Sequence, residues 1–218
     1  MVGLLGGIDE AGRGPVIGPM AVAGVALDRK AQLRLKKLGV RDSKTLSSKR
    51  REELYGEIQL LSSRIATLMI QPDQIDEVVT KGRKYRKLNY LEAIYFARVA
   101  DQLGASEVIV DASDSSPKRF RDNILEHMGR KCKVVAAHKA DRDYTVVSAA
   151  SVVAKVERDR AIERLKRRLG DFGSGYPSDP VTKAFILEKL KTGESLPDVV
   201  RKSWRTLGNL QQTLLAPL

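Results

Sequence analysis

The stretch from Gly6 to Pro19, GGIDEAGRGPVIGP, constrains the fold more than any other part of the chain. An apolar run, Val2 to Ile8, predicts a buried strand that leads into two adjacent carboxylates, Asp9 and Glu10. Successive side chains of a regular strand point to opposite faces of a sheet. If both acids serve one site, we therefore expect the strand to end or bend at Glu10, with Gly12 allowing the turn.

A simpler interpretation treats the acids as solvated and the Gly-Arg-Gly-Pro segment as an ordinary turn. The charge balance of the chain argues against it. The 218 residues carry 39 Lys and Arg against 27 Asp and Glu, a net charge of +12. Such a surplus indicates a polyanionic partner, with nucleic acid as the leading candidate, although it does not separate an enzyme from a binding protein.

The length of the chain allows one substantial core with a small appended unit. A single cysteine, Cys132, excludes a disulfide or a thiolate zinc site within the chain. No run is long enough to cross a membrane, and the first residues do not resemble a cleavable leader. We therefore expect an intracellular, cytoplasmic protein without a membrane partner, and a monomer.

Periodicity predicts the order of the elements. Apolar runs predict strands at 2–8, 20–27, 64–70, 107–111 and 133–137. Helical spacing and capping residues predict helices at 47–61, 72–79, 88–103, 117–128, 145–169 and 180–191, with shorter helical pieces from 197 onward. This order predicts an α/β fold: a mixed sheet flanked by helices over residues 1–170, with a helical C-terminal portion, 171–218, packed on it.

Acids follow several of the predicted strands. Asp111 ends one strand and Asp141 follows the next, so both are expected near Asp9 and Glu10 at the carboxyl edge of the sheet. Ionised pairs a few ångströms apart repel by roughly 1 to 4 kcal/mol, depending on the effective dielectric. A divalent cation would relieve that repulsion, and all-oxygen ligation suits Mg²⁺ or Mn²⁺ rather than zinc.

Other residues compete for roles in such a site. Asp114, Asp143 and Asp179 are rival carboxylates, and Asp143 is the strongest because it shares a short loop with Asp141. His138 precedes Asp141 by three residues, and its role stays open, as does that of Asp143. The glycines after Glu10 miss the dinucleotide-binding pattern, and no Walker-type phosphate loop is present.

Basic and aromatic residues supply candidate nucleic-acid contacts. The densest positive run, TKGRKYRK, extends from Thr80 to Lys87 and could equally be a solvated loop. Lys44 could bind phosphate or could simply pair with Asp42. Tyr176, within the loop GSGYPSDP, suits stacking on a sugar or base, although an aromatic residue there could equally cover the core.

Together these segments resemble type 2 ribonuclease H, or ribonuclease HII, of the archaeal kind. The motifs that carry the resemblance span nearly the whole chain in the order of the family: GIDEAGRGP from Gly7, DSK from Asp42, VD at Val110, HKAD from His138, AASVVAKVERD from Ala149, GSGYPSDP from Gly173 and WRT from Trp204.

The resemblance implies roles for individual residues. The four metal-binding acids of the family correspond to Asp9, Glu10, Asp111 and Asp141. Its glycine-arginine-glycine element, which senses a ribose 2′-hydroxyl, corresponds to Gly12, Arg13 and Gly14. Its tyrosine, which stacks at the sugar on the DNA side of an RNA–DNA junction, corresponds to Tyr176. Lys44 resembles its phosphate-contacting lysine, and Asn89 is aligned with an asparagine near the nucleic-acid backbone, although the residues around it differ from the family pattern.

The implied function is a metal-dependent endonuclease with a ribonuclease H-like sheet. It would hydrolyse the RNA strand of RNA–DNA hybrids and cut 5′ of ribonucleotides embedded in duplex DNA, using two metal ions and leaving 3′-hydroxyl and 5′-phosphate ends. Two alternatives use the same features: a non-catalytic binder of hybrid duplexes, and a metal-dependent phosphatase acting on small substrates.

The last residues, QQTLLAPL, resemble the clamp-binding peptide that some members of the family carry. Gln211 and Leu214 have the spacing of that peptide, but Pro217 and Leu218 occupy the positions where aromatic anchors are expected. Because such anchors supply much of the binding energy, only weak binding to a sliding clamp is expected. The alternative is that leucines of the tail pack on the core.

Overall fold

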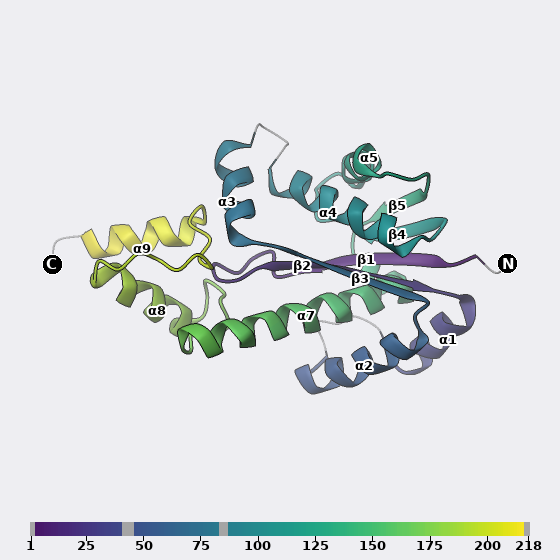
Figure 1. The fold of residues 1–218 in the computed structure, drawn as a ribbon, viewed down its shortest axis with the longest axis horizontal. Coiled ribbons are helices and arrows are strands. Elements are labelled where there is room, and N and C mark those ends of the chain that lie inside the picture. Colours follow the sequence, from purple (N-terminus) through teal and green to yellow (C-terminus); the bar gives the residue numbers. More distant parts are fainter. Residues whose placement is uncertain (1–2, 41–45, 83–86, 216–218) are drawn as a thin grey trace.

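The computed structural model describes residues 3–40, 46–82 and 87–215, with side chains up to residue 212. A five-stranded sheet forms its centre, in the order β3-β2-β1-β4-β5 (Figure 1). β1 pairs antiparallel with β2 and parallel with β4, β2 pairs antiparallel with β3, and β4 pairs parallel with β5. The strands are β1 (Leu5–Ala11), β2 (Met20–Leu27), β3 (Arg64–Ile70), β4 (Glu107–Asp111) and β5 (Lys133–Ala137).

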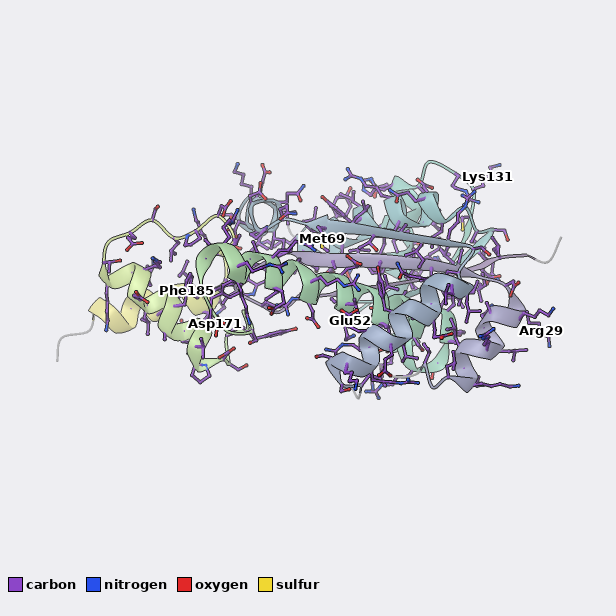
Figure 2. The ribbon with its side chains drawn as sticks, turned by 60° about the horizontal axis from the view of Figure 1, so that its bottom comes forward. Arg29, Glu52, Met69, Lys131, Asp171 and Phe185 are labelled. Atoms are coloured by element: carbon purple, nitrogen blue, oxygen red, sulfur yellow. The ribbon has the colours of Figure 1, made fainter. Side chains whose placement is uncertain are left out.

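Helices cover both faces of the sheet. The upper face in Figure 1 carries α3 (Pro72–Lys81), α4 (Leu88–Leu103) and α5 (Pro117–His127). The lower face carries α1 (Arg29–Lys37), α2 (Ser48–Leu61) and α7 (Thr145–Leu169), and Figure 2 labels Arg29 on α1 and Glu52 on α2. The short helix α6 (Ala140–Asp143) precedes α7, and α8 (Pro180–Lys191) and α9 (Arg205–Leu215) extend beyond one end of the sheet.

The first half of α7 packs unusually close to β1. Its small apolar residues, from Val146 to Ala154, are buried. A Cβ added at Gly7 would lie 2.4 Å from the carbonyl of Val146, so only glycine allows the two backbones to approach this closely. This packing sets α7 against the strand that carries Asp9.

Residues after α7 form an apolar cluster around the segment that follows β1. The cluster joins Val16 and Ile17 to Phe172, Ile186 and Val200. A backbone bridge pairs Ile17 with Val200. The helical C-terminal portion therefore holds the loop that leaves the central strand.

The predicted fold class is confirmed, and several predicted boundaries coincide with the observed ones: 20–27, 64–70, 88–103, 107–111, 133–137, 145–169 and 180–191. Two helices were not predicted. The segment of α1 is rich in basic residues and was not predicted as a helix, although Asp28 is its N-cap: the Asp28 carboxylate accepts a hydrogen bond from the amide of Ala31. The other, α6, has only four residues, which is too short to show a periodicity.

The first strand was expected to end or bend at Glu10 if both acids serve one site, and it does not end there. β1 continues to Ala11, which pairs with Ala21 of β2. The partner strand is buried along its whole length, so the ladder gains from extending past both acids. The backbone turns at Gly12, the glycine expected to allow it, where φ is +87°.

Candidate metal centre and substrate pocket

Three carboxylates converge at one edge of the sheet. Asp9 lies in β1, Asp111 ends β4 and Asp141 lies in α6. One oxygen atom from each lies within 4.8 Å of the other two. Asp9 and Asp141 are buried, and Asp111 is half-buried. This arrangement of oxygen ligands could hold Mg²⁺ or Mn²⁺.

Local hydrogen bonds fix these acids. The Asp111 carboxylate accepts a hydrogen bond of 3.0 Å from the amide of Ala140, which ties the end of β4 to the start of α6. The hydroxyl of Ser148, on α7, donates to the Asp141 carbonyl at 2.5 Å. α6 is therefore anchored on both sides, and its acid is held beside the two that the strands provide.

The environment of the cluster disfavours negative charge. Burial raises the pKa of Asp9 to about 6, and the nearby Asp111 adds to the shift, whereas Lys155 and a hydrogen bond from Ser151 oppose it. Burial also raises the pKa of Glu10, with further contributions from Asp9 and Glu92. A cation bound among these groups would stabilise their ionised forms.

Glu10 lies next to the cluster but outside the group of three. Asp9 faces Ser151 and Lys155 of α7, whereas Glu10 is directed toward Glu92 of α4, as the alternation of a regular strand requires. The amide of Glu10 donates a 2.8 Å hydrogen bond to the Asp9 carboxylate. Among the described residues, the enclosed Oε2 atom of Glu10 has no hydrogen-bond partner, so this oxygen is available to a ligand.

The loop of Gly12, Arg13 and Gly14 is held by its carbonyl groups. The Arg201 guanidinium donates to the carbonyls of Gly12 at 2.6 Å and Arg13 at 2.8 Å. The indole of Trp204 donates to the Gly14 carbonyl at 3.2 Å. Sequence reasoning missed Arg201 and gave Trp204 no role beyond the WRT motif, because nothing in the local sequence indicates contact with a loop almost 190 positions away.

Tyr176 lies beside this loop. The Gly175 carbonyl accepts hydrogen bonds from the amides of Val16 at 2.7 Å and Ile17 at 3.2 Å, which joins the two loops. Tyr176 is 40% exposed, and the guanidinium of Arg158 lies 5.3 Å from the centroid of its ring. Tyr176 is therefore an exposed side chain and not a cover for the core.

A pocket of about 380 Å³ extends from Glu10 to Tyr176. Its lining contains both an acid of the central strand and the exposed tyrosine, together with positive side chains from α2 and α7. The lining residues are Glu10, Ala11, Gly12, Arg51, Lys155, Arg158, Asp159 and Tyr176. Sequence reasoning did not assign roles to Lys155 or Arg158, although both fall within the motif that begins at Ala149.

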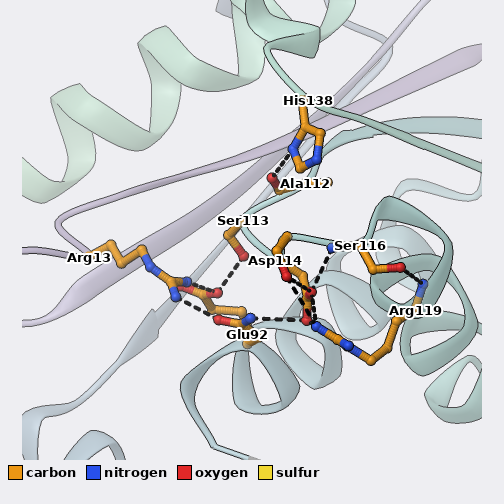
Figure 3. A network of polar contacts seen from close by, with 10 residues as sticks. Arg13, Glu92, Ala112, Ser113, Asp114, Ser116, Arg119 and His138 are labelled. Atoms are coloured by element: carbon orange, nitrogen blue, oxygen red, sulfur yellow. Dashed lines mark hydrogen bonds and ion pairs between the residues drawn. The ribbon is translucent and has the colours of Figure 1, made fainter. Parts of the chain in front are cut away.

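The side chains of Arg13 and Asn89 are brought together, but they contact protein groups. Figure 3 shows Arg13 against Glu92, in the same network as Asp114 and Arg119. Arg13 forms an ion pair with the buried Glu92 and donates a 2.6 Å hydrogen bond to Asn89 Oδ1. Asn89 Nδ2 in turn donates to Asp114 at 2.9 Å. Although burial opposes it, the pKa of Asp114 falls to about 2 because Arg119, the Ser116 amide and Asn89 hydrogen-bond its carboxylate. The rival acid Asp114 is thus engaged in this network.

The remaining candidate residues that the structure describes do not join the group of three acids. Asp179 caps α8 through the amide of Val181 at 2.9 Å, which gives it a structural role. Asp143 is exposed and lies outside the group of three acids. His138 is also exposed, and its Nδ1 atom donates to the Ala112 carbonyl at 3.2 Å (Figure 3). Lys44 lies outside the described residues.

Within the described ranges, none of the helices combines the length and apolar character that a membrane crossing requires.

Solved structures support the assignment of the fold. The ribonuclease H2 of Pyrococcus horikoshii matches with a TM-score of 0.87 and 39% identity, covering 98% of this chain and 100% of that one. The ribonuclease HII of Archaeoglobus fulgidus, solved as a complex with PCNA, matches with a TM-score of 0.84 and 45% identity over 95% and 97% of the two chains. A ribonuclease HIII solved with Mn²⁺ shares the fold at 20% identity, with a TM-score of 0.82 over 97% of this chain and 70% of that one.

Sequence comparisons lead to the same family. The ribonuclease HII of Methanosarcina mazei is 45% identical over 97% of this chain and 98% of its own length. That of Thermococcus sibiricus is 44% identical over 96% and 92%, respectively. The family model described as ribonuclease HII matches residues 6–207. With these matches and the acid cluster together, the chain belongs to the ribonuclease HII family.

Proposed function

We propose that this endoribonuclease, which acts on the RNA strand of RNA–DNA hybrids, also cuts 5′ of ribonucleotides embedded in duplex DNA by a two-metal mechanism. The observation that carries the proposal is the convergence of Asp9, Asp111 and Asp141, with Glu10 adjacent, beside a pocket that contains an exposed tyrosine. When bound there, Mg²⁺ or Mn²⁺ would activate the attacking water and neutralise the leaving 3′-oxygen, giving 3′-hydroxyl and 5′-phosphate ends.

The protein's own residues would position the substrate. Gly12, Arg13 and Gly14 would approach the ribose through backbone groups, because the Arg13 side chain is already paired with Glu92. Tyr176 would stack on the neighbouring deoxyribose. Lys155 lines the same pocket, where its positive charge suits the scissile phosphate.

A larger basic groove supports a nucleic-acid substrate over a small phosphate ester. A second pocket, of about 780 Å³, runs along α7 and shares Arg51, Arg158 and Asp159 with the first. Its lining includes six basic and three acidic side chains. Such an excess of positive charge beside the acids suits a phosphate backbone that continues past the cleavage site. Lys44 is proposed as a further phosphate contact, and Asn89 as one that would require its present hydrogen bonds to be exchanged.

The acids are tested by charge-neutralising substitutions. Asp9→Asn and Asp111→Asn should each lower hydrolysis of a labelled hybrid duplex in Mg²⁺ by at least about a hundredfold, because each removes a metal ligand. Hybrid binding, measured by fluorescence anisotropy, should remain within about threefold of wild type, since the basic groove is unchanged. Asp143→Asn is the matched control: it removes an exposed acid from the helix that holds Asp141, and should leave hydrolysis near wild type.

Activity within tenfold of wild type in both Asp9→Asn and Asp111→Asn would contradict the site assignment. Loss of activity in Asp143→Asn as well would place that acid in the site. A wild-type protein that binds hybrid but never cleaves it would support the non-catalytic alternative.

Junction recognition is tested at Tyr176. Stacking of a ring on a nucleotide is worth roughly 1 to 3 kcal/mol, so Tyr176→Ala should reduce cleavage at a single embedded ribonucleotide about tenfold or more. Cleavage within a long RNA stretch should fall less, because many registers lack a DNA sugar at that position. Tyr176→Phe keeps the ring and should retain the wild-type ratio of the two rates. Equal losses on both substrates would argue against a junction-reading role.

Clamp binding is proposed from the tail and from the PCNA complex of the Archaeoglobus relative. Leu210 packs against the apolar cluster that includes Phe172 and Ile186. A chain that ends at Leu210 therefore keeps this contact while losing Gln211 and Leu214. Titration of PCNA with the full chain should give weak saturable binding, and the shortened chain should give none. Indistinguishable isotherms would leave the tail without a role in clamp binding.

A further inference from the structure

Arg201 is a fully buried cation at the centre of the link between the C-terminal portion and the loop after β1. Its relative exposure is 0%. Three of its nitrogen atoms donate to backbone carbonyls, at 2.6 Å to Gly12, 2.8 Å to Arg13 and 3.0 Å to Gly18. Burial lowers its pKa to about 10, so the group remains charged near neutral pH.

Neighbouring groups fix the position of Arg201 itself. Its amide donates to the Val16 carbonyl at 2.8 Å, and its guanidinium lies 5.0 Å from the centroid of the Trp204 ring. The carboxylate of Asp76, on α3, accepts hydrogen bonds of 2.8 Å from the amides of Lys202 and Ser203. The segment that carries the arginine is therefore anchored to a second element of the fold.

These contacts determine where the loop amides point. In a planar trans peptide the carbonyl and the following N–H have opposite directions. Because the carbonyls of Gly12 and Arg13 are directed at Arg201, the amides of Arg13 and Gly14 point away from it. These two donors could therefore meet a hydroxyl group on the open side of the loop. Arg201 is too deeply buried to meet a substrate, so it acts only through the loop.

The chemistry of the contact favours arginine specifically. A planar guanidinium reaches several acceptors in fixed directions, whereas the ammonium of lysine is a single point. Burying a charge costs free energy that an apolar side chain of similar size would not. A buried arginine whose hydrogen bonds go to loop carbonyls is therefore better explained by positioning of the loop than by stabilisation of the fold.

We propose that Arg201 is the positioning residue for ribose recognition, and that the helical C-terminal portion thereby sets how the loop of Gly12, Arg13 and Gly14 reads a 2′-hydroxyl. The inference rests on the proposed function of this loop. It adds that the recognition geometry is imposed from residues 201–204, outside the sheet that carries the acids.

The experiment compares two ligands on a parent that does not cleave them. In an Asp9→Asn background with Mg²⁺, the Kd is measured for duplex DNA that contains one ribonucleotide and for the same duplex made only of DNA. The ratio of the two Kd values reports ribose recognition. Added to this parent are R201K, R201M and W204F, the last of which removes the indole donor to Gly14 but keeps an aromatic ring over the guanidinium.

The matched control is Ile186→Ala, which opens a cavity in the apolar cluster around Val16 and Ile17 without removing a side-chain hydrogen bond to the loop carbonyls. We expect R201K and R201M to lower the ribose preference by about fivefold or more and W204F by less, because each loses directed hydrogen bonds to the loop. Affinity for all-DNA duplex should stay within about twofold in these variants. Ile186→Ala should lower the melting temperature by a similar amount and leave the preference unchanged.

The outcomes separate this inference from the function on which it rests. A parent without ribose preference would contradict the proposed function and the inference together. A parent with preference that R201K and W204F both retain would overturn the inference alone, and these two conservative changes decide the matter even if R201M fails to fold. An equal loss of preference in Ile186→Ala would also overturn it, because general loosening would then explain the effect.

Discussion

The mutual repulsion of Asp9, Asp111 and Asp141 is the constraint on which the rest of the structure depends. Carboxylate oxygens within 4.8 Å of one another can stay together only where rigid elements hold them. β1 lies at the centre of the sheet, and Gly7 lets α7 pack directly on it. Hydrogen bonds from Ala140 to Asp111 and from Ser148 to the Asp141 carbonyl anchor the helix that carries the third acid. The free energy that these contacts supply offsets a repulsion that a bound cation would remove.

Most of the fold and the core of the site follow from the sequence because both depend on local signals. The runs at 20–27 and 107–111 are short and apolar, which is typical of buried strands, and the small apolar residues of 145–154 indicate a helix buried on all sides. The topological rule that places sites beyond the carboxyl ends of parallel strands was enough to bring Asp111 and Asp141 to Asp9.

The features that the sequence does not predict depend on distant contacts. The length of β1 is set by pairing with β2, so its own segment did not show that the strand continues past Asp9 and Glu10. The side chain of Arg13 pairs with Glu92, 79 positions away in the sequence. Only the backbone of Arg13 therefore remains as a candidate for ribose recognition. The contacts of Arg201 with Gly12 and Gly18 span more than 180 positions and have no local signature.

The central claim, that this cluster is unstable as bare anions and stable around a cation, is tested most directly by unfolding wild type and Asp9→Asn without metal from pH 4 to 8. The pKa of Asp9 is raised from 3.8 to about 6 in the folded protein, so stability present at low pH is lost as pH rises through 6. Asp9→Asn should therefore be more stable at pH 8, by up to about 3 kcal/mol, and the gap should close toward pH 4. Adding Mn²⁺ at pH 8 should stabilise wild type and reverse the order. Equal stability of both proteins across this range, or equal stabilisation of both by Mn²⁺, would contradict the account.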